Sequence, residues 1–157
     1  MTPIHSLVAL LKQAQAERDG ARAALQRADA AATRAKLQLD QLLTYRRDYE
    51  RRWNEQFAQR GDIDIVRCYQ NFMQRLSQAI EQQQRSAEHI DSGVQLARNA
   101  LRGHETRVAS IRKLIERRTK ELQSALERQE QKVSDERASQ SAWQRDASVT
   151  RPMSAPH

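Results

Sequence analysis

The chain has 157 residues, of which 38% are hydrophobic, 30% are charged and only 4% are aromatic. It contains 22 Ala and 19 Gln but only 4 Gly and 3 Pro, and its formal net charge is +7. A composition so poor in turn formers and aromatic residues excludes a layered α/β core and a β-sandwich. Ala, Gln, Glu and Arg favour long helices, because they lose little conformational freedom there. We therefore expect binding on a helix surface rather than catalysis in a concave pocket.

The basic charge raises the prospect of an anionic partner. Acidic residues are interspersed with the basic ones, however, as in residues 17–19 and 48–52, which favours a solvated helix face over a phosphate-binding stripe. The one cysteine, Cys68, excludes an internal disulfide and suits a reducing compartment. The apolar run at residues 7–11 is too short for a signal peptide or a membrane span. We expect a soluble, cytosolic protein.

A first long helix is predicted over about residues 3–59. From Leu7 to Gln56, a series of fifteen positions follows an alternating spacing of four and three residues, and twelve of them are apolar. Such a sustained seam is typical of a coiled coil. The middle of the seam is rich in Ala, so a partner helix can approach closely there.

A second long helix is predicted over about residues 63–146. The first pattern stops at about residues 60–62, where Gly61 suits the left-handed end of one helix and Asp62 the N-cap of the next. A second seam then runs from Val66 to Ala125, with fifteen apolar residues at its eighteen positions. We expect a disordered tail over residues 147–157.

A short turn between two long heptad helices predicts an all-α fold, an antiparallel coiled-coil hairpin that forms a single domain over residues 1–146. With the turn at Gly61, residue i faces a residue numbered about 122 − i, which places Trp53 opposite Tyr69 and Leu39 opposite Gln83. The first helix begins near residue 4, so the last part of the second helix has no first-helix residues opposite it. About 25 residues of the second helix, roughly 40 Å, are therefore expected to project as a single-helix C-terminal overhang.

No catalytic or metal-binding constellation is present in the sequence. The histidines, His5, His89, His104 and His157, have no metal-ligand spacing to one another or to Cys68. His104 falls on the second seam, where a polar insertion that specifies register is expected. Cys68 is interpreted as a small, half-buried residue. We expect no enzymatic activity, no metal and no cofactor.

Six of the seven aromatic residues lie between Tyr45 and Phe72. Packing at the closed end of the hairpin explains Trp53 and Tyr69, which are expected to meet. Phe72 begins a stripe with i, i+4, i+7 and i+11 spacing, and the outer edge of this stripe is expected to face away from the first helix. Its members are Phe72, Leu76, Ala79 and Gln83. The sequence leaves two interpretations open, ordinary packing and a docking surface.

Three segments occur in order along the chain. The first contains Leu39, Leu42, Tyr45, Arg46 and Tyr49. The second follows Gly61 and contains Tyr69, Gln70, Phe72, Leu76, Ala79 and Ile80. The third contains Glu130, Gln131, Lys132, Asp135 and Glu136. With these spacings the sequence resembles the FliJ family of flagellar type III export proteins over essentially the whole chain to about residue 140.

The resemblance implies an antiparallel two-helix coiled coil, similar in shape to the central stalk subunit of rotary ATPases. It implies a non-enzymatic protein that docks in the pore of the hexameric flagellar export ATPase and promotes its activity. The implied further partners are the cytoplasmic domain of the export gate and the export chaperones of late substrates. The implied location is the cytoplasm, peripherally at the cytoplasmic face of the inner membrane at the flagellar base.

The resemblance also implies two contact surfaces. The export-gate contact comprises Phe72, Leu76, Ala79 and Gln83. The ATPase contact, at the opposite end, comprises Leu7, Leu11, Gln131, Lys132, Asp135 and Glu136.

Two other functions remain open from the residues alone. One is an unrelated coiled-coil scaffold or chaperone, self-associating through leftover apolar positions such as Leu10, Leu37 and Leu43. The other is a basic helical nucleic-acid-binding protein, whose affinity would fall steeply with salt because neutralised phosphates release counterions. The resemblance favours neither, and we expect no nucleic-acid partner.

Overall fold

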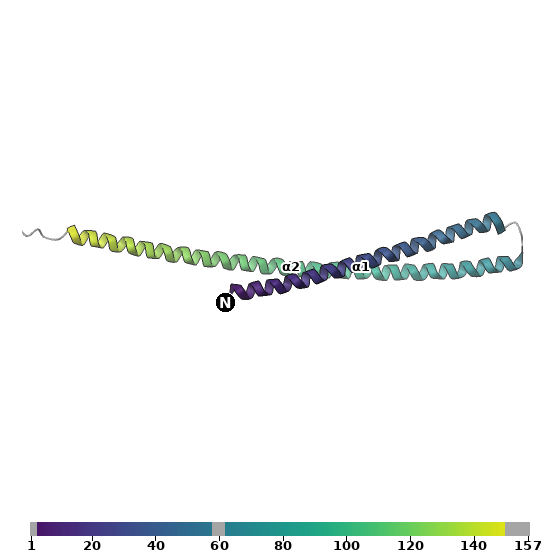
Figure 1. Ribbon diagram of the computed structural model, residues 1–157, viewed down its shortest axis with the longest axis horizontal. Coiled ribbons are helices and arrows are strands. Elements are labelled where there is room, and N and C mark those ends of the chain that lie inside the picture. The colour runs from purple at the N-terminus through teal and green to yellow at the C-terminus, as the bar shows by residue number, and fades with distance from the viewer. Residues whose placement is uncertain (1–2, 58–61, 150–157) are drawn as a thin grey trace, which may run out of the picture. The chain divides into compact units, whose positions relative to one another are not determined.

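The computed structural model describes residues 3–57 and 62–149, and all of its regular structure is helical (Figure 1). Helix α1 spans Ile4–Arg52, a π-helical turn η1 spans Trp53–Phe57, and helix α2 spans Ile63–Val149. No strand occurs in these two described ranges. The structure confirms the predicted all-α fold of two long helices.

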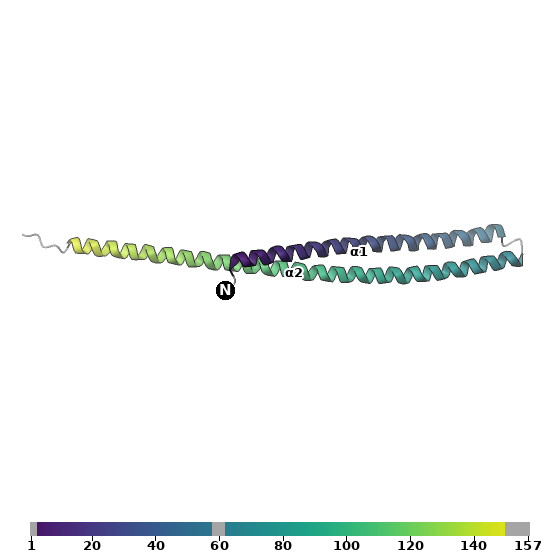
Figure 2. The ribbon, with the colours of Figure 1, turned by 60° about the horizontal axis from the view of Figure 1, so that its bottom comes forward.

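The chain divides into two compact units, and both long helices contribute to each of them. We call Lys12–Val108 the hairpin unit, and Met1–Leu11 together with Ala109–His157 the terminal unit. Within the hairpin unit, α1 and α2 run antiparallel and side by side (Figure 2). This arrangement is the predicted helical hairpin.

The core of the hairpin unit consists of residues from the two predicted seams. Its buried hydrophobic residues are Ala14, Ala32, Ala35, Leu76, Ile80, Val94 and Val108. Helix α1 supplies only alanines to this set, whereas α2 supplies larger side chains. Because small residues on one helix accept larger ones from the other, the two helices can pack closely even though little apolar area is available per turn.

Contacts between the helices confirm the predicted register of the hairpin unit. Near the closed end, the rings of Trp53 and Tyr69 stack with centroids 4.1 Å apart. Towards the other end, Glu17 Oε2 lies 3.9 Å from His104 Nδ1. Both pairs fit the relation in which residue i faces a residue numbered about 122 − i.

The ends of the helices next to the turn differ in how well the sequence predicts them. Asp62 is the N-cap of α2, since its Oδ1 accepts a hydrogen bond from the Asp64 amide at 3.2 Å and its carbonyl accepts one from the Val66 amide at 3.1 Å. Helix α1 ends at Arg52 and not near residue 59, because the chain continues as the π-helical turn η1. A π-helical turn adds a residue to the turn and breaks the heptad spacing. Gly61 lies outside the described residues.

In the terminal unit, Leu7 and Ile111 are buried, and Leu11 and Ile115 are half-buried. Every residue of α2 from 119 to 149 is exposed, and we call this segment the overhang (Figure 2). At 1.5 Å per residue it is about 46 Å long. The structure therefore confirms the predicted single-helix overhang.

Helix α2 continues to Val149, so residues 147–149 are helical and the expectation of disorder there is wrong. They simply extend the helix, since Ala, Ser and Val are all tolerated in a last turn. The remainder of the predicted tail, residues 150–157, lies outside the described residues. Gly93 and Gly103 are exposed inside α2, and a Cβ at either would meet nothing within 4 Å, so close packing does not require glycine at either position.

Candidate functional site

A cluster of five aromatic rings closes the described end of the hairpin unit. Tyr45, Tyr49 and Trp53 come from α1 and η1, and Tyr69 and Phe72 come from α2. The Tyr49 ring centroid lies 4.4 Å from that of Phe72 and 5.9 Å from that of Tyr69, with the two tyrosine planes 7° apart. Aromatic pairs of this kind contribute about 0.5–1.5 kcal/mol each beyond the area they bury. The cluster thus holds together the end at which the chain reverses.

The predicted outward orientation is wrong for Phe72, the first residue of the stripe. Phe72 is half-buried and turned towards α1, with its ring 6.0 Å from that of Tyr45 in an edge-on arrangement. Leu76, one turn further along, is part of the buried core. Both side chains face inward because the aromatic cluster and the seam offer them more apolar contact than solvent does. Ala79 alone among the four stripe residues is exposed.

Gln83, the last residue of the stripe, is held by α1. Its Nε2 donates to the Ala35 carbonyl oxygen at 3.1 Å and to Gln38 Oε1 at 3.2 Å. The side chain is half-buried, and a small residue at Ala35 gives it access to the α1 backbone. Gln83 therefore serves the hairpin directly, whatever partner contacts it makes in addition.

An open hollow of about 220 Å³ lies beside the aromatic cluster. It is lined by Tyr49, Trp53, Asp64, Ile65, Cys68 and Tyr69. Cys68 lines this open hollow and is exposed rather than half-buried as expected. Partial burial raises the pKa of the Tyr69 hydroxyl, and the negative charge of Glu50 and the neighbouring Tyr49 add to the increase.

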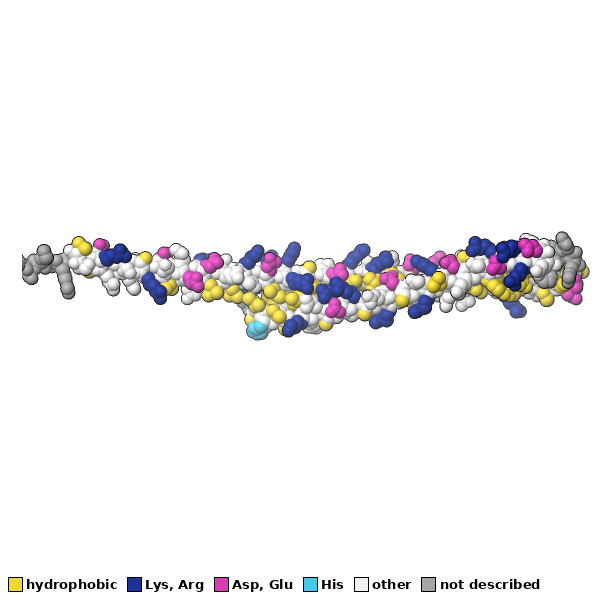
Figure 3. All heavy atoms as spheres, turned by 45° about the horizontal axis from the view of Figure 1, so that its top comes forward, with side chains coloured by type: hydrophobic (Ala, Val, Ile, Leu, Met, Phe, Trp, Pro, Cys, Tyr) yellow, Lys and Arg dark blue, Asp and Glu magenta, His cyan; other side chains and the backbone are white. Residues whose placement is uncertain are grey.

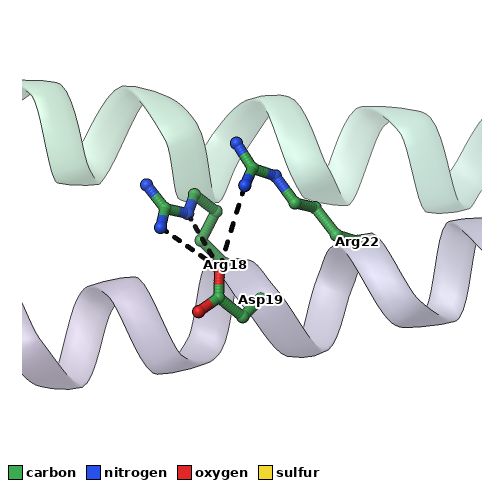
Figure 4. A network of polar contacts seen from close by, with 3 residues as sticks. All are labelled: Arg18, Asp19 and Arg22. Atoms are coloured by element: carbon green, nitrogen blue, oxygen red, sulfur yellow. Dashed lines mark hydrogen bonds and ion pairs between the residues drawn. The ribbon is translucent and has the colours of Figure 1, made fainter.

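A charged side chain, that of Arg18, lies on the seam of the hairpin unit. Its side chain is only 16% exposed, and its Nη2 lies 3.1 Å from Asp19 Oδ1 (Figure 4). The same carboxylate oxygen is 4.0 Å from Arg22 Nη1. Arg18 occupies a seam position that heptad packing would fill with an apolar residue. Asp19 compensates the charge of Arg18, so this ion pair allows a charged residue to occupy a seam position.

Glu17 connects the two helices of the hairpin unit. Its Oε2 lies 3.9 Å from His104 Nδ1 and 3.7 Å from Arg107 Nη1. All three side chains are partly or largely exposed, so the pairs add little to stability. They do favour one alignment of α1 on α2, which supports the register role expected of His104.

The residues assigned to the ATPase contact form two groups within the terminal unit. Leu7 is buried and Leu11 is half-buried. The other four, Gln131, Lys132, Asp135 and Glu136, are exposed on the overhang, where Gln131 Nε2 donates to Asp135 Oδ1 at 3.4 Å. Gln131 lies 13 residues beyond Arg118, the last residue of α2 that is not exposed. That distance is roughly 20 Å along the helix, so the structure does not bring the two groups together.

Four apolar residues on the overhang were not predicted to be exposed. Leu122 was assigned to the seam, and Leu126, Val133 and Trp143 were not singled out, yet all four are exposed. The available signal was spacing, because Leu122, Leu126 and Val133 are separated by four and then seven residues and so share one helix face.

Basic and acidic side chains alternate over the visible faces of both helices, with no stripe of one sign (Figure 3). In the described part of the chain, no group of three or more His, Cys, Asp or Glu residues is placed to hold a metal ion. Neither long helix, over the residues that the structure describes, has an apolar stretch that could cross a lipid bilayer.

The fold and its surfaces define a coiled-coil protein that offers helix faces to partners: a hairpin closed by aromatic packing, and an uncovered overhang. A family model described as Flagellar FliJ protein matches residues 4–147, nearly the whole chain. The chain therefore belongs to the flagellar FliJ protein family, as the resemblance of its three segments indicated, and is a component of flagellar type III protein export. Searches of curated proteins and of solved structures return no match.

Proposed function

We propose that this chain is a non-enzymatic stalk that docks in the hexameric flagellar export ATPase and promotes its activity. It links the ATPase to the cytoplasmic domain of the export gate and to the export chaperones of late substrates. Its place of action is the cytoplasmic face of the inner membrane at the flagellar base, where it is held peripherally through the apparatus. The observation that carries the proposal is the overhang, a helix of 31 exposed residues in a chain of this family.

The overhang supplies the ATPase contact. Lys132, Asp135 and Glu136 present both signs of charge within about one helical turn, and Gln131 adds an amide. Exposed pairs of this kind are individually weak, so they permit many exchangeable contacts with the wall of a ring rather than one deep attachment. Leu7 and Leu11 contribute indirectly to the ATPase contact, because their burial holds the start of α1 in the terminal unit.

The export-gate contact lies on α2 around Ala79, the exposed member of the stripe. Phe72 and Leu76 support this surface from inside the hairpin, and Gln83 is anchored to α1 through the Ala35 carbonyl. A small side chain at Ala79 lets an apolar partner approach the helix backbone closely. The gate would therefore recognise the surface contour of α2 and not a protruding aromatic ring.

Two truncated chains test the ATPase contact. A chain that ends at Ser124 lacks most of the overhang, whereas a matched control that ends at Val149 lacks only residues 150–157. Every described residue that the shorter chain lacks is exposed, so both chains should keep the melting temperature of the full chain. We expect ATP hydrolysis by the export ATPase to be stimulated by the control and not by the shorter chain. Full stimulation by the chain ending at Ser124 would place the contact elsewhere.

The gate contact is tested by Ala79→Asp, with Ala100→Asp as the control. Both alanines are exposed on α2, so neither substitution buries a charge in the folded chain. An aspartate at an apolar interface must be desolvated, which costs several kcal/mol without a counter-charge. Calorimetric titration with the gate's cytoplasmic domain should show at least a tenfold loss of affinity for Ala79→Asp and none for Ala100→Asp. Equal affinities would remove Ala79 from the contact.

We also propose that residues 1–146 behave as a single domain, in which the hairpin and terminal units unfold together. Both units are built from the same two helices, and a break between them would interrupt the backbone hydrogen bonds of α1 and α2. Scanning calorimetry of the full chain should show one cooperative transition. Two resolved transitions would assign the units to separate domains.

A further inference from the structure

Four basic residues share one face of α2 around the start of the overhang. They are Lys113, Arg117, Lys120 and Arg128, and all four are exposed. At about 100° per residue their directions fall within roughly 80° of one another, and they extend over roughly 22 Å of helix. Ser124 lies on the same face, between Lys120 and Arg128. We call these five residues the basic cradle.

The short side chain of Ser124 leaves room between the longer side chains around it. All five residues of the cradle line an open hollow of about 510 Å³, and Glu116 and Glu121 lie at its margins. A carboxylate seated over Ser124 would accept a hydrogen bond from its hydroxyl. It would also lie between Lys120 and Arg128, each about one helical turn away, and charge-assisted hydrogen bonds to such groups are the strong ones. The hollow therefore offers the donors that an acidic side chain requires.

Most of the positive charge of the cradle is not compensated by the chain itself. Lys120 Nζ lies 3.8 Å from Glu116 Oε1, whereas Glu121 Oε2 lies 4.0 Å from Nη1 of Arg118, which is outside the cradle. The other three cations of the cradle make no ion pair within residues 3–57 and 62–149; they are Lys113, Arg117 and Arg128. Like charges three or four residues apart, as these cations and Lys120 are, destabilise a helix. A bound anion would relieve this repulsion.

We propose that the basic cradle binds an acidic helix of a partner protein. Two helices that lie side by side share a rise of about 1.5 Å per residue, so carboxylates at spacings of four and three residues would meet the cations in order. The cradle is also longer than a single small anion. No two acidic residues of this sequence are four positions apart, so a second copy of the chain does not offer the matching pattern.

The surroundings of the cradle disfavour nucleic acid. Glu116 and Glu127 border the cradle on one side, and Glu121 borders it on the other. Duplex DNA carries a charge about every 1.7 Å along its axis, so its phosphates would meet these carboxylates as well as the cations. An acidic helix presents separate carboxylates, which can face the cations and avoid the three glutamates.

The apolar residues of the overhang disfavour a membrane. Leu122 lies about 180° around the helix from Lys113, and Leu126 lies close to the same direction as Leu122. Binding to an anionic bilayer is strong when apolar contact and charge attraction act together. A bilayer could contact either the leucines or the cradle, because they are on opposite sides of α2. A protein partner needs only the cradle.

This inference goes beyond the proposed function and does not depend on it. The ATPase contact was assigned to Leu7, Leu11 and residues within 131–136, none of which belongs to the cradle. The experiments below use the purified full chain and synthetic probes. Their failure would therefore leave the ATPase contact untouched, and failure of the ATPase contact would leave the cradle untouched.

Nuclear magnetic resonance titration of the isotope-labelled chain tests the binding. The probe is a synthetic helical peptide with glutamates at spacings of four and three residues, and its control carries glutamine in their place. Only the acidic peptide should shift backbone signals, and the shifts should concentrate in residues 113–128. The double variant Arg117→Gln, Arg128→Gln should bind at least about tenfold more weakly, since it loses two charge-assisted contacts. The matched control Arg75→Gln, Arg98→Gln removes the same charge at exposed positions of α2 and should bind within about twofold of the unmodified chain.

All four altered arginines are exposed, so circular dichroism should report unchanged folding in both variants. Equal weakening in the two variants would mean that binding follows net charge, and it would overturn the cradle. Shifts spread over the whole chain, or none at residues 113–128, would overturn it as well. Duplex DNA and vesicles of anionic lipid serve as competing probes. If either bound more tightly than the acidic peptide and lost this binding in the Arg117→Gln, Arg128→Gln chain, an acidic helix would be the wrong partner.

Discussion

The side-chain amide of Gln83 on α2 donates a hydrogen bond to the main-chain carbonyl oxygen of Ala35 on α1, 3.1 Å away. Ala35 is buried and small, so it brings the α1 backbone within reach of a side chain from the opposite helix. The contact ties a residue that the sequence assigned to a partner surface to the packing of the hairpin itself. A loss of partner binding on changing Gln83 must therefore be separated from a loss of stability.

Gln83→Ala should lower the free energy of unfolding by about 0.5–1.5 kcal/mol, because one half-buried hydrogen bond is lost. Gln83→Glu should cost more, since its carboxylate cannot donate and would face the Ala35 carbonyl oxygen. Urea denaturation of the two variants beside the unmodified chain measures both effects. Equal stability of all three chains would mean that the hydrogen bond contributes nothing.

Leu76→Ala should lower the free energy of unfolding by about 2–5 kcal/mol, because it leaves a cavity in a buried seam position. Leu96→Ala is the control, since Leu96 is exposed on the same helix and its change should stay within about 0.5 kcal/mol. Thermal melts of the two variants distinguish a packing role of Leu76 from a purely binding one. A stable Leu76→Ala chain that fails to bind the gate would contradict the core assignment.

Arg18→Leu should stabilise the hairpin, by an amount of the order of 1 kcal/mol, because it replaces a largely buried charge on the seam by an apolar side chain. Asp19 is exposed and can turn to solvent when its partner is removed. The melting temperature is the measurement, with Arg22→Leu as a control at a more exposed position. A lower melting temperature for Arg18→Leu would show that the Arg18–Asp19 contact outweighs seam packing.

The stability of the hairpin should fall with pH above about 10, the ordinary pKa of tyrosine. Burial, Glu50 and Tyr49 raise the pKa of Tyr69 in the folded chain. The unfolded chain therefore loses this proton at a lower pH than the folded chain, and the favourable contribution, complete below pH 10, is lost as the pH rises through the folded value. Melting temperatures against pH for the unmodified chain and Tyr69→Phe should diverge above about pH 10, with the steeper decline in the unmodified chain. Parallel curves would contradict a shifted Tyr69.

Much of the fold could be predicted from the sequence because its seams are long and regular. The nine buried hydrophobic residues of the described chain all occupy predicted seam positions, from Leu7 to Ile111. The N-cap at Asp62 was predictable for a similar reason, since capping depends on the chemistry of one side chain next to a helix start. The π-helical turn at Trp53–Phe57 was not, because a heptad pattern carries no signal for one extra residue in a turn.

The candidate surfaces were predicted less well. The stripe from Phe72 to Gln83 was expected to have an outward-facing edge, yet the ring of Phe72 turns inward and meets those of Tyr45 and Tyr49. Residue spacing predicts the direction of a side chain around the helix axis only to within the angle between neighbouring residues. A large ring can bend across that angle and reach the opposite helix. Cys68 shows the reverse case, since it lies beside the aromatic cluster in sequence but is exposed in the structure.

The sequence by itself determined that two long helices pair antiparallel in one register and that α2 outlasts α1. Hydrophobic periodicity and helix length are local properties, and an all-helical fold has few other ways to bury its seams. Only the tertiary structure decided that Phe72, beside the predicted seam, turns inward and that Ala79 and Leu126 remain outside. That outcome depends on the size and chemistry of the side chains on the opposite helix, which no local pattern contains.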